Sequence, residues 1–436
     1  MRKGYSFANI HHKLNLLTNF LALTMKFLLT SHPGYGHINP LIALGIALLS
    51  RGHDVIYATS AVFEKHISNT GIRAISAGAE WTESDVGKHY PEFNKLNFLE
   101  RSSWMEDLLW NKAPKSMIPD LLKIIEQEDP DLLISNAYDW SGALAAEISG
   151  KAHALASIAV KVPGMCFEAI FEENYQSHRK LFGLQEDIDF SRTRRYLELS
   201  FMPESWSFPG YHAHANEHFI RPLFYDLKNS DSNFKWNLRF SEKPMVYVSL
   251  GTVTNDHSHL FRVIINALAG EDYNVIMTIG ENNNPQQFDP LPANVLLAPY
   301  IPQSLILPQV DVCICHGGVS TVLASLAEGI PLLVLPLGAD QPINASVCQL
   351  LNVAPPLPKR LMSGEYSGAE SLQVNRVDED FIRTTLKNIL ADTSYKVSAL
   401  RIKNEISALP SLQTAAVLIE ELAEKVNIEA LKAKGP

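Results

Sequence analysis

The chain has 436 residues, of which 46% are hydrophobic and 19% are charged, and its formal net charge at pH 7 is −10. This length is enough to bury two hydrophobic cores, so two domains are expected. The acidic balance and the lack of a long lysine or arginine run argue against a nucleic-acid partner. The sequence has no stretch of about 18 uninterrupted apolar residues that could span a bilayer, and its four cysteines are too few for a disulfide framework. We therefore expect a cytoplasmic protein.

Residues 1–24 look at first like a signal peptide, because several basic residues precede the apolar run at 14–23. No small-residue cleavage site follows that run. Instead, residues 25–30 read MKFLLT, which is typical of the first strand of a domain. We therefore interpret residues 1–24 as a dispensable N-terminal extension and Met25 as a candidate start.

The first domain is predicted over residues 25–221. It opens with a strand at 27–30, a glycine-containing loop at 31–37 and a helix at about 39–50, and a further strand follows at 54–58. Strand, glycine loop, helix and strand in this order form a βαβ unit of the doubly wound type. A second unit is predicted with a strand at 132–135 and a helix at 141–148.

Between these two units, residues 78–115 contain several tryptophans and other aromatic residues without a clear period. Most of these side chains should pack in the core or in loops, but such an excursion is also where an apolar ligand would be held. We expect residues 78–115 and 160–220 to decide which small molecule is bound. Within the second stretch, His212, His214 and His218 resemble zinc-ligand spacing only loosely, and we interpret them as part of an exposed loop.

The second domain is predicted over residues 244–405, after a polar linker at 222–243, and a helical tail follows at 406–436. A strand followed by a turn is predicted at 245–252, and further strands are predicted at 274–278, 295–298 and 310–315. The domain thus opens a second βαβ series, and the whole chain is predicted to be an α/β protein with two Rossmann-like sheets.

The most informative segment runs from residue 316 to residue 345 and reads HGGVSTVLASLAEGIPLLVLPLGADQPINA. Gly317 and Gly318 come just before a predicted helix that ends at Gly329. A helix N-terminus carries unpaired N–H groups and a partial positive charge, so a diphosphate can bind there without a lysine. A strand at 330–335 follows, and its apolar residues on both faces are typical of a buried parallel sheet.

Asp340 and Gln341 come after that strand, at the carboxyl end where ligands of open α/β sheets bind. An acid and an amide side by side can accept and donate hydrogen bonds to several sugar hydroxyls. The segment therefore fits a sugar-nucleotide site. It also fits an ordinary α/β turn with a solvated polar corner, so spacing alone leaves both interpretations open.

With these residues the segment resembles the donor-binding signature of the UDP-glycosyltransferase superfamily, in its bacterial antibiotic and macrolide branch. That signature is H-G-G-x-G-T, then G-x-P, then D-Q-x-x-N-A. It is matched here at His316, Gly317, Gly318, Thr321, Gly329, Pro331, Asp340, Gln341, Asn344 and Ala345. The resemblance implies the GT-B architecture, in which two Rossmann-like domains face each other across a cleft.

The resemblance also implies which residues hold the donor. His316 and the N–H groups at the helix start would hold the diphosphate, and Asp340 with Gln341 would orient the hexose. The expected set is Ser249, Gly251, Thr252, Ile301, Gln303, His316, Gly318, Val319, Ser320, Thr321, Asp340, Gln341 and Asn344. No D-x-D cluster lies near the expected cleft, so no metal is expected, and an NDP-sugar is the co-substrate rather than a resident cofactor.

Glycosyl transfer needs a base that takes the proton of the acceptor hydroxyl. His37 lies at the glycine-flanked strand-to-helix turn, and imidazole titrates near neutral pH. A helix-capping or packing role fits the sequence of this turn equally well. In the family, the histidine of the matching G-H-x-x-P motif, here at residues 36–40, is the usual base. His32 is the second choice, because it lies on the other side of the loop glycines.

Two positions depart from the family pattern. Relatives commonly place an aspartate after the strand at 132–135, where it orients and charges the base, but this chain has Asn136 there. Asparagine can fix the tautomer of His37 but cannot stabilise an imidazolium. Asp139 could substitute for the missing charge, although an N-cap role for the helix near Ser141 is the favoured interpretation.

The second departure is Ala324, where relatives often have a glutamate that grips the nucleotide ribose. Glu328 lies about 6 Å further along the helix axis and is expected to be too deep to replace it. A weaker ribose grip is compatible with a thymidine-type nucleotide, although UDP stays the first expectation.

These features predict an inverting, metal-independent glycosyltransferase that moves a hexose from an NDP-sugar to a hydroxyl of an apolar small molecule, such as a natural product. A nucleotide-sugar epimerase is the alternative within enzymes, although the sequence offers no carboxylates to act around the sugar. A non-catalytic sugar-nucleotide-binding helper is the alternative from another class, suggested by Asn136 and Ala324.

Overall fold

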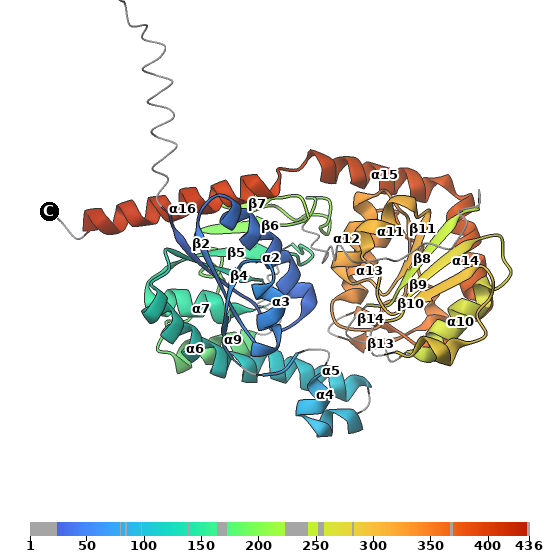
Figure 1. Cartoon of the computed structure of the whole chain (residues 1–436), viewed down its shortest axis with the longest axis horizontal. Helices are drawn as coiled ribbons and strands as arrows, with labels where there is room; N and C mark the ends of the chain where they lie inside the picture. The colour runs from blue at the N-terminus through green and yellow to red at the C-terminus, as the bar shows by residue number, and fades with distance from the viewer. Residues whose placement is uncertain are drawn as a thin grey trace, which may run out of the picture.

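The structure is a computed structural model, and it describes residues 24–78, 80–82, 85–96, 98–137, 139–163, 172–222, 243–251, 257–280, 283–366 and 369–433. These residues form two parallel β-sheets with helices around them, one in each half of the molecule (Figure 1). The predicted α/β fold with two Rossmann-like sheets is confirmed. The predicted extension, apart from residue 24, and the predicted linker, apart from residues 222 and 243, lie outside the described residues.

The first sheet has the strand order β3-β2-β1-β4-β5-β6-β7, and all its pairings are parallel. Its strands are β1 Lys26–Thr30, β2 Asp54–Thr59, β3 Arg73–Ser76, β4 Leu132–Asn136, β5 Ala152–Ser157, β6 Leu197–Ser200 and β7 Glu217–Phe219. The order reverses between β1 and β4, which are hydrogen-bonded neighbours. Their carboxyl ends therefore form the switch point at which open α/β sheets bind ligands.

The helices of the first half are α2 Tyr35–Ser50, α3 Glu64–Ser68, α4 Val86–His89, α5 Phe98–Asp107, α6 Ala113–Glu128, α7 Trp140–Ser149 and α9 Glu172–Leu181. The prediction that the first helix begins near Asn39 is wrong by four residues. The amides of His37 and Ile38 both donate to the Gly34 carbonyl, at 3.0 and 2.9 Å, so the helix starts before Pro40. His37 therefore lies in the first turn of α2 instead of in a loop.

The aromatic stretch at 78–115 forms a helical excursion from the sheet, which Figure 1 shows at α4 and α5. Trp81, Val86 and Leu108 are buried together, with Trp104 and Tyr90 packed against them. Much of the predicted excursion is thus its own small core.

The second sheet has the strand order β10-β9-β8-β11-β12 and is also parallel. Its strands are β8 Met245–Ser249, β9 Asn274–Thr278, β10 Val295–Ala298, β11 Val312–Cys315 and β12 Leu332–Val334. The strands predicted at 310–315 and 330–335 are therefore shorter than expected. The amide of Val310 bonds to Leu307 and that of Ile330 to Ser325, so both are used by the preceding helical turn.

The helices of the second half are α10 Ser258–Leu268, α11 Gln303–Ile306, α12 Val319–Ala327, α13 Gln341–Leu350, α14 Glu379–Ala391 and α15 Thr393–Ala408. A hairpin of β13 Met362–Tyr366 and β14 Ala369–Leu372 completes this half. In Figure 1, α12 and α13 lie on the side of the second half that faces α2 and α3 of the first. None of the described helices is both long and apolar enough to cross a membrane.

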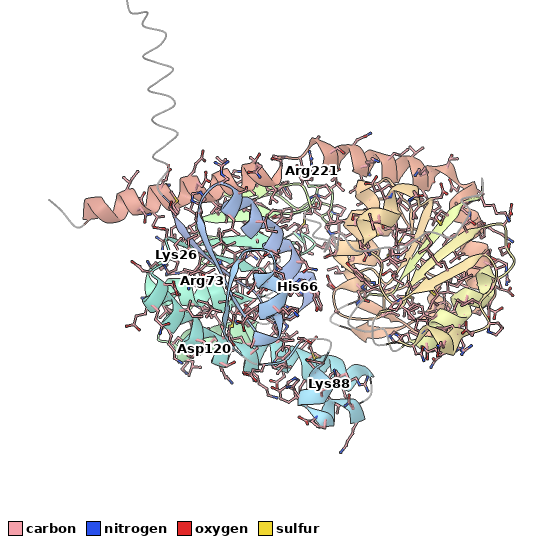
Figure 2. All side chains as sticks on the ribbon, in the orientation of Figure 1. Lys26, His66, Arg73, Lys88, Asp120 and Arg221 are labelled. Atoms are coloured by element: carbon pink, nitrogen blue, oxygen red, sulfur yellow. The ribbon has the colours of Figure 1, made fainter. Side chains whose placement is uncertain are left out.

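The C-terminal helices join the two halves. Figure 1 shows α15 along the second half and α16, Leu412–Ala433, back along the first. Glu420 of α16 accepts hydrogen bonds from Arg51 Nη2 at 2.7 Å and contacts His53 Nε2 at 2.6 Å. At the junction of the two helices, Arg221 donates to the Ser407 carbonyl at 2.6 Å (Figure 2). The C-terminal helices therefore connect the two halves.

Candidate functional site

The first part of the site lies at the switch point of the first sheet. His37 is the third residue of α2, and Asn136 is the last residue of β4. Because α2 follows β1, and β1 pairs with β4, the two side chains meet, and His37 Nδ1 lies 3.2 Å from Asn136 Oδ1. Asn136 is 1% exposed, so its amide is held in place by the surrounding protein. The amide oxygen can accept the ring N–H and so fix the histidine tautomer.

Asp139 has the N-cap position of α7. Its Oδ1 accepts a hydrogen bond from the Ser141 amide at 2.9 Å, which is the cap that the sequence favours for this residue. The carboxyl group is buried, and burial raises its pKa. Asn136 contacts His37, and Asp139 caps the next helix.

His32 lies closer to His37 than the sequence suggests. Its ring centroid is 3.9 Å from that of His37, so the prediction that the loop glycines separate the two histidines is wrong. The Gly34 amide donates to the His32 carbonyl at 2.9 Å, and this tight turn folds the chain back. The signal available in the sequence was the Pro33-Gly34 pair, which is typical of a turn.

The second part of the site surrounds residues 316–318 of the other half. Gly317 has φ +91°, and a Cβ there would lie 2.9 Å from Val334 Cγ1 and 3.1 Å from the Gln341 carbonyl oxygen. Only glycine fits this backbone without strain. Asn344 Nδ2 donates to the Gly317 carbonyl at 2.9 Å and to Asp340 Oδ2 at 3.0 Å. Asn344 therefore ties the glycine loop to α13, a role that the sequence did not reveal.

The loop leads into the N-terminus of α12. Gly318 is the N-cap residue, and it has no side chain that could accept a hydrogen bond from the first amides of the helix. Val319 is the first residue of the helix, Ser320 is exposed and Thr321 is buried. Gln303, the first residue of α11, donates to Thr321 Oγ1 at 3.1 Å. These contacts hold a helix N-terminus of the kind that binds anions.

His316 is packed beneath this helix start. Its ring lies so close to Gly251 and Gly318 that a Cβ on either glycine would collide with it. Burial lowers the pKa of His316 to about 4, although a backbone hydrogen bond with Ser249 opposes this shift. The imidazole is therefore neutral at pH 7 and can offer a hydrogen bond to a phosphate but no positive charge. Ser249 ends β8 and is buried, and Thr252 lies outside the described residues.

The Asp340-Gln341 corner is less open than the sequence suggests. Gln341 Oε1 accepts hydrogen bonds from the Leu337 amide at 2.8 Å and the Gly338 amide at 3.1 Å, so it shapes the loop before α13. Asp340 is the N-cap residue of α13 and contacts Asn344. Ile301 is 2% exposed and packs in the core next to α11.

Comparisons with known proteins find glycosyltransferases that are similar to this chain. Residues 262–422 match the family described as "Erythromycin biosynthesis protein CIII-like, C-terminal domain". The chain is 26% identical to the NDP-glycosyltransferase YjiC of Bacillus subtilis, over 86% of this chain and 95% of the relative. It is 24% identical to the 4'-demethylrebeccamycin synthase of Lentzea aerocolonigenes, over 91% and 99% of the two chains. The chain is a glycosyltransferase, and these relatives support the antibiotic branch of the UDP-glycosyltransferase superfamily.

Solved structures share the fold of this glycosyltransferase. CalG4, the calicheamicin glycosyltransferase, superposes with a TM-score of 0.76 at 20% identity, covering 93% of this chain and 99% of the other. The glycosyltransferase VinC, solved in complex with dTDP, has a TM-score of 0.64 at 21% identity, covering 92% and 100% of the chains. The GT-B architecture predicted from the sequence is thereby confirmed.

The second half departs from the family pattern at Ala324, and the surroundings of this residue are apolar. Ala324 is buried in the core on α12. Glu328 is the C-cap residue of the same helix and pairs with Lys403 of α15 at 3.2 Å, so its side chain faces the C-terminal helix. In the described part of the glycosyltransferase, no three His, Cys, Asp or Glu side chains come together as metal ligands would.

Proposed function

We propose that the protein is an inverting glycosyltransferase that moves a hexose from an NDP-sugar to a hydroxyl of an apolar small molecule, without a metal ion. The observation that carries the proposal is the contact of His37 Nδ1 with Asn136 Oδ1 at 3.2 Å. Because Nδ1 makes this contact, Nε2 is the ring nitrogen that would take a proton from an acceptor hydroxyl in the proposed reaction.

In the proposed reaction, His37 takes the proton as the acceptor oxygen attacks the anomeric carbon. The bond between that carbon and the diphosphate oxygen breaks, and its electron pair leaves with the nucleoside diphosphate. One direct displacement inverts the anomeric centre. The N-terminus of α12 supports the negative charge that develops on the diphosphate. Asn344 acts indirectly, because it holds the glycine loop that precedes this helix.

Two observations bear on the identity of the donor nucleotide. Ala324 offers no hydrogen bond to a ribose hydroxyl, and the similar protein VinC was solved with dTDP. Both facts are compatible with a thymidine-type donor, and UDP-glucose stays the first donor to test.

The test is an incubation of the protein with UDP-glucose or dTDP-glucose and a panel of phenolic and polyketide acceptors, read by mass spectrometry and by NMR of the anomeric proton. A hexose added with inverted configuration supports the proposal. Isomerised donor without transfer would instead favour an epimerase. Tight donor binding with neither product would favour a non-catalytic helper. The neutral Asn136 is the observation that suggests this alternative.

A further inference from the structure

The carboxyl group of Asp139 uses only one of its two oxygens to cap α7. The side chain is 6% exposed, and its Oδ1 accepts a hydrogen bond from the Ser141 amide at 2.9 Å. Oδ2 has no hydrogen-bond partner among the described residues. A buried polar atom without a partner costs about 1–3 kcal/mol, so native structures seldom keep one without a reason. Asp139 therefore has a second oxygen to offer beyond the cap.

This oxygen belongs to a group of buried polar atoms at the ends of β1 and β2. Ser60 Oγ and Trp81 Nε1 are likewise without a partner in the described part of the chain, and their side chains line the same space as Asp139 and His32. The space is about 20 Å³, which is enough for one water molecule. A water molecule can accept from the Trp81 indole and donate to Asp139 Oδ2, and the Ser60 hydroxyl can do either. These atoms are thus suited to hold one buried water.

His32 connects this water site with the proposed base. It lines the same space, and its ring centroid is 3.9 Å from that of His37, with an angle of 49° between the two rings. Burial raises the pKa of Asp139, whereas its hydrogen bonds with Ser141 and the nearby His32 lower it, so His32 and Asp139 are close enough for their charges to interact. Asp139, His32 and His37 therefore form a row.

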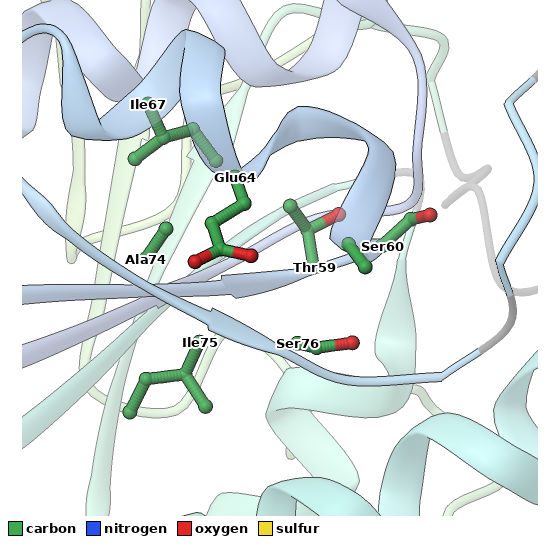
Figure 3. A pocket seen from close by; sticks show the side chains of 8 residues that line it. Thr59, Ser60, Glu64, Ile67, Ala74, Ile75 and Ser76 are labelled. Carbon is green, nitrogen blue, oxygen red and sulfur yellow. The ribbon is translucent and has the colours of Figure 1, made fainter.

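The other titratable side chains around this row do not compete with Asp139. Burial raises the pKa of Tyr57, so its hydroxyl stays neutral. Glu64 of α3 lines a separate hollow, shown in Figure 3, and neither His32 nor Asp139 lines that hollow. Asp139 is thus the carboxyl group that shares a space with His32.

The row gives His37 a source of negative charge that its direct partner lacks. An imidazole that donates a hydrogen bond to a carboxylate gains electron density, as metal-binding histidines do. An electron-rich ring next to a cation stabilises that cation. Through His32, an ionised Asp139 would therefore stabilise the imidazolium of His37, which the neutral amide of Asn136 cannot do.

We propose that Asp139 is a positioning residue that acts on His37 through His32 and one buried water, and supplies the negative charge that Asn136 does not. This inference rests on the proposed function, in which His37 is the base. The proton of the acceptor hydroxyl moves to His37 Nε2 and stays there during the displacement, so no proton travels along the row. Asp139 and His32 stabilise the imidazolium that this step creates.

The kinetic test is a double-mutant cycle on kcat for sugar transfer. Asp139→Asn removes the charge and keeps the cap, because asparagine caps a helix about as well as aspartate. It should lower kcat about fivefold in the wild type and less than about twofold in Asn136→Asp, where a carboxylate contacts the ring directly. Asp392→Asn is the matched control. Asp392 caps α15 by the same kind of contact, from the Ser394 amide at 2.9 Å, and its exchange should leave kcat unchanged.

A second measurement does not depend on activity. NMR titration of the histidine rings, assigned with His32→Asn, gives the pH at which His32 is half protonated in the full chain. A neighbouring carboxylate favours the protonated ring, so this pH should be about one unit lower in Asp139→Asn than in the wild type. Asp392→Asn should not change it.

An unchanged kcat in Asp139→Asn overturns the positioning role, as does an equal loss in both backgrounds or in Asp392→Asn. An unchanged titration of His32 overturns the contact on which the role depends. Both failures leave the proposed function standing if the wild type transfers sugar and His37→Ala does not. If the wild type transfers no sugar, a lowered titration of His32 supports the row and contradicts the proposed function alone. Thermal melting of each variant checks that the fold is retained.

Discussion

Asn136 gives the proposed base a neutral partner where an aspartate is common in the family. The amide holds the His37 ring at 3.2 Å but offers no negative charge when the ring becomes an imidazolium. A base of this kind suits an acceptor whose hydroxyl is already acidic, such as a phenol. Other acceptors should then react slowly for lack of a charged partner.

The substitution Asn136→Asp tests this reasoning. A carboxylate at the same place stabilises the imidazolium, so the rate with an aliphatic alcohol should rise about tenfold, and the rate with a phenol should change much less. The measurement is kcat for one acceptor of each type. An equal change for both acceptors, or a fall with the alcohol only, would show that the charge of the partner does not limit the reaction.

Two histidines with a lowered pKa predict how stability depends on pH. Burial lowers the pKa of His316 to about 4, and burial also lowers that of His153, whose Nε2 lies 2.7 Å from Ser135 Oγ, to about 4. A histidine of ordinary pKa takes up its proton near pH 6.5 in the unfolded chain. Below that pH the unfolded state binds more protons than the folded state, so the free energy of unfolding decreases as the pH falls from 6.5 toward 4.

Each histidine should cost about 2 kcal/mol of stability between pH 6.5 and pH 5. Urea unfolding at several pH values measures the slope, and His153→Gln should remove about half of it, whatever its effect on the absolute stability. An unchanged slope in the variant would mean that His153 is protonated in the folded protein.

At the scale of single residues, His37 was predicted from its glycine-flanked turn and from the resemblance to the family. That resemblance also led to Asn136, with Asp139 as its substitute. His32 was placed wrongly, since a tight turn at Pro33-Gly34 reverses the chain over two residues. The linking role of Asn344 was also hidden, because its partner is a backbone carbonyl and leaves no signature in the sequence.

Among the elements, the turn from β11 into α12 depends most strictly on its residue types. Gly317 combines a left-handed backbone with a close approach of Val334 and Gln341. The exchange Gly317→Ala should therefore both destabilise the protein, by about 2 kcal/mol or more, and weaken UDP binding at least tenfold.

The matched control is Gly270→Ala. Gly270 also has a positive φ, +70°, but a Cβ there would meet nothing within 4 Å. Its exchange should cost only the backbone strain of about 1 kcal/mol and leave UDP binding unchanged. Thermal melting and calorimetric titration with UDP measure both quantities. Equal effects of the two exchanges would show that the contacts of Gly317 do not matter.

The elements themselves were largely predictable. The strands β9 and β10 have the predicted bounds, since both are short apolar runs between polar turns. Pro40 did not show where α2 starts, because a proline can also lie after the first turn of a helix. The helix then lacks only the hydrogen bond that the nitrogen of the proline cannot donate. The irregular helices after β3 were hidden as well, because their aromatic side chains pack mainly among themselves.

In the whole molecule, the C-terminal helices make the two halves one structure. One continuous cluster of buried side chains contains Phe27 and Leu41 from the first half, Cys315 from the second, and Ile402 and Ile419 from α15 and α16. The contact of Glu420 with Arg51 and His53 fixes the place of α16 on the first half. Sequence patterns could not show that this tail packs on the first half, because the packing depends on contacts between residues more than 360 positions apart.

The substitution Glu420→Ala should lower the stability of the first half by about 1–3 kcal/mol, because it leaves Arg51 and the largely buried His53 without this acceptor. The exposed Glu424 on the same helix provides the control, and Glu424→Ala should change the melting temperature little. Hydrogen exchange of α2 and α16 would report the effect locally. Equal melting temperatures for both variants would contradict a structural role for the Glu420 contact.

The most direct test of the central claim is the initial rate of sugar transfer by His37→Ala, measured with the best donor and acceptor found for the wild type. Loss of a positioned general base predicts a fall in kcat of about 100-fold or more. The exchange of exposed His218 in β7 to alanine should leave the rate unchanged. Transfer by His37→Ala at the wild-type rate would contradict the proposed mechanism.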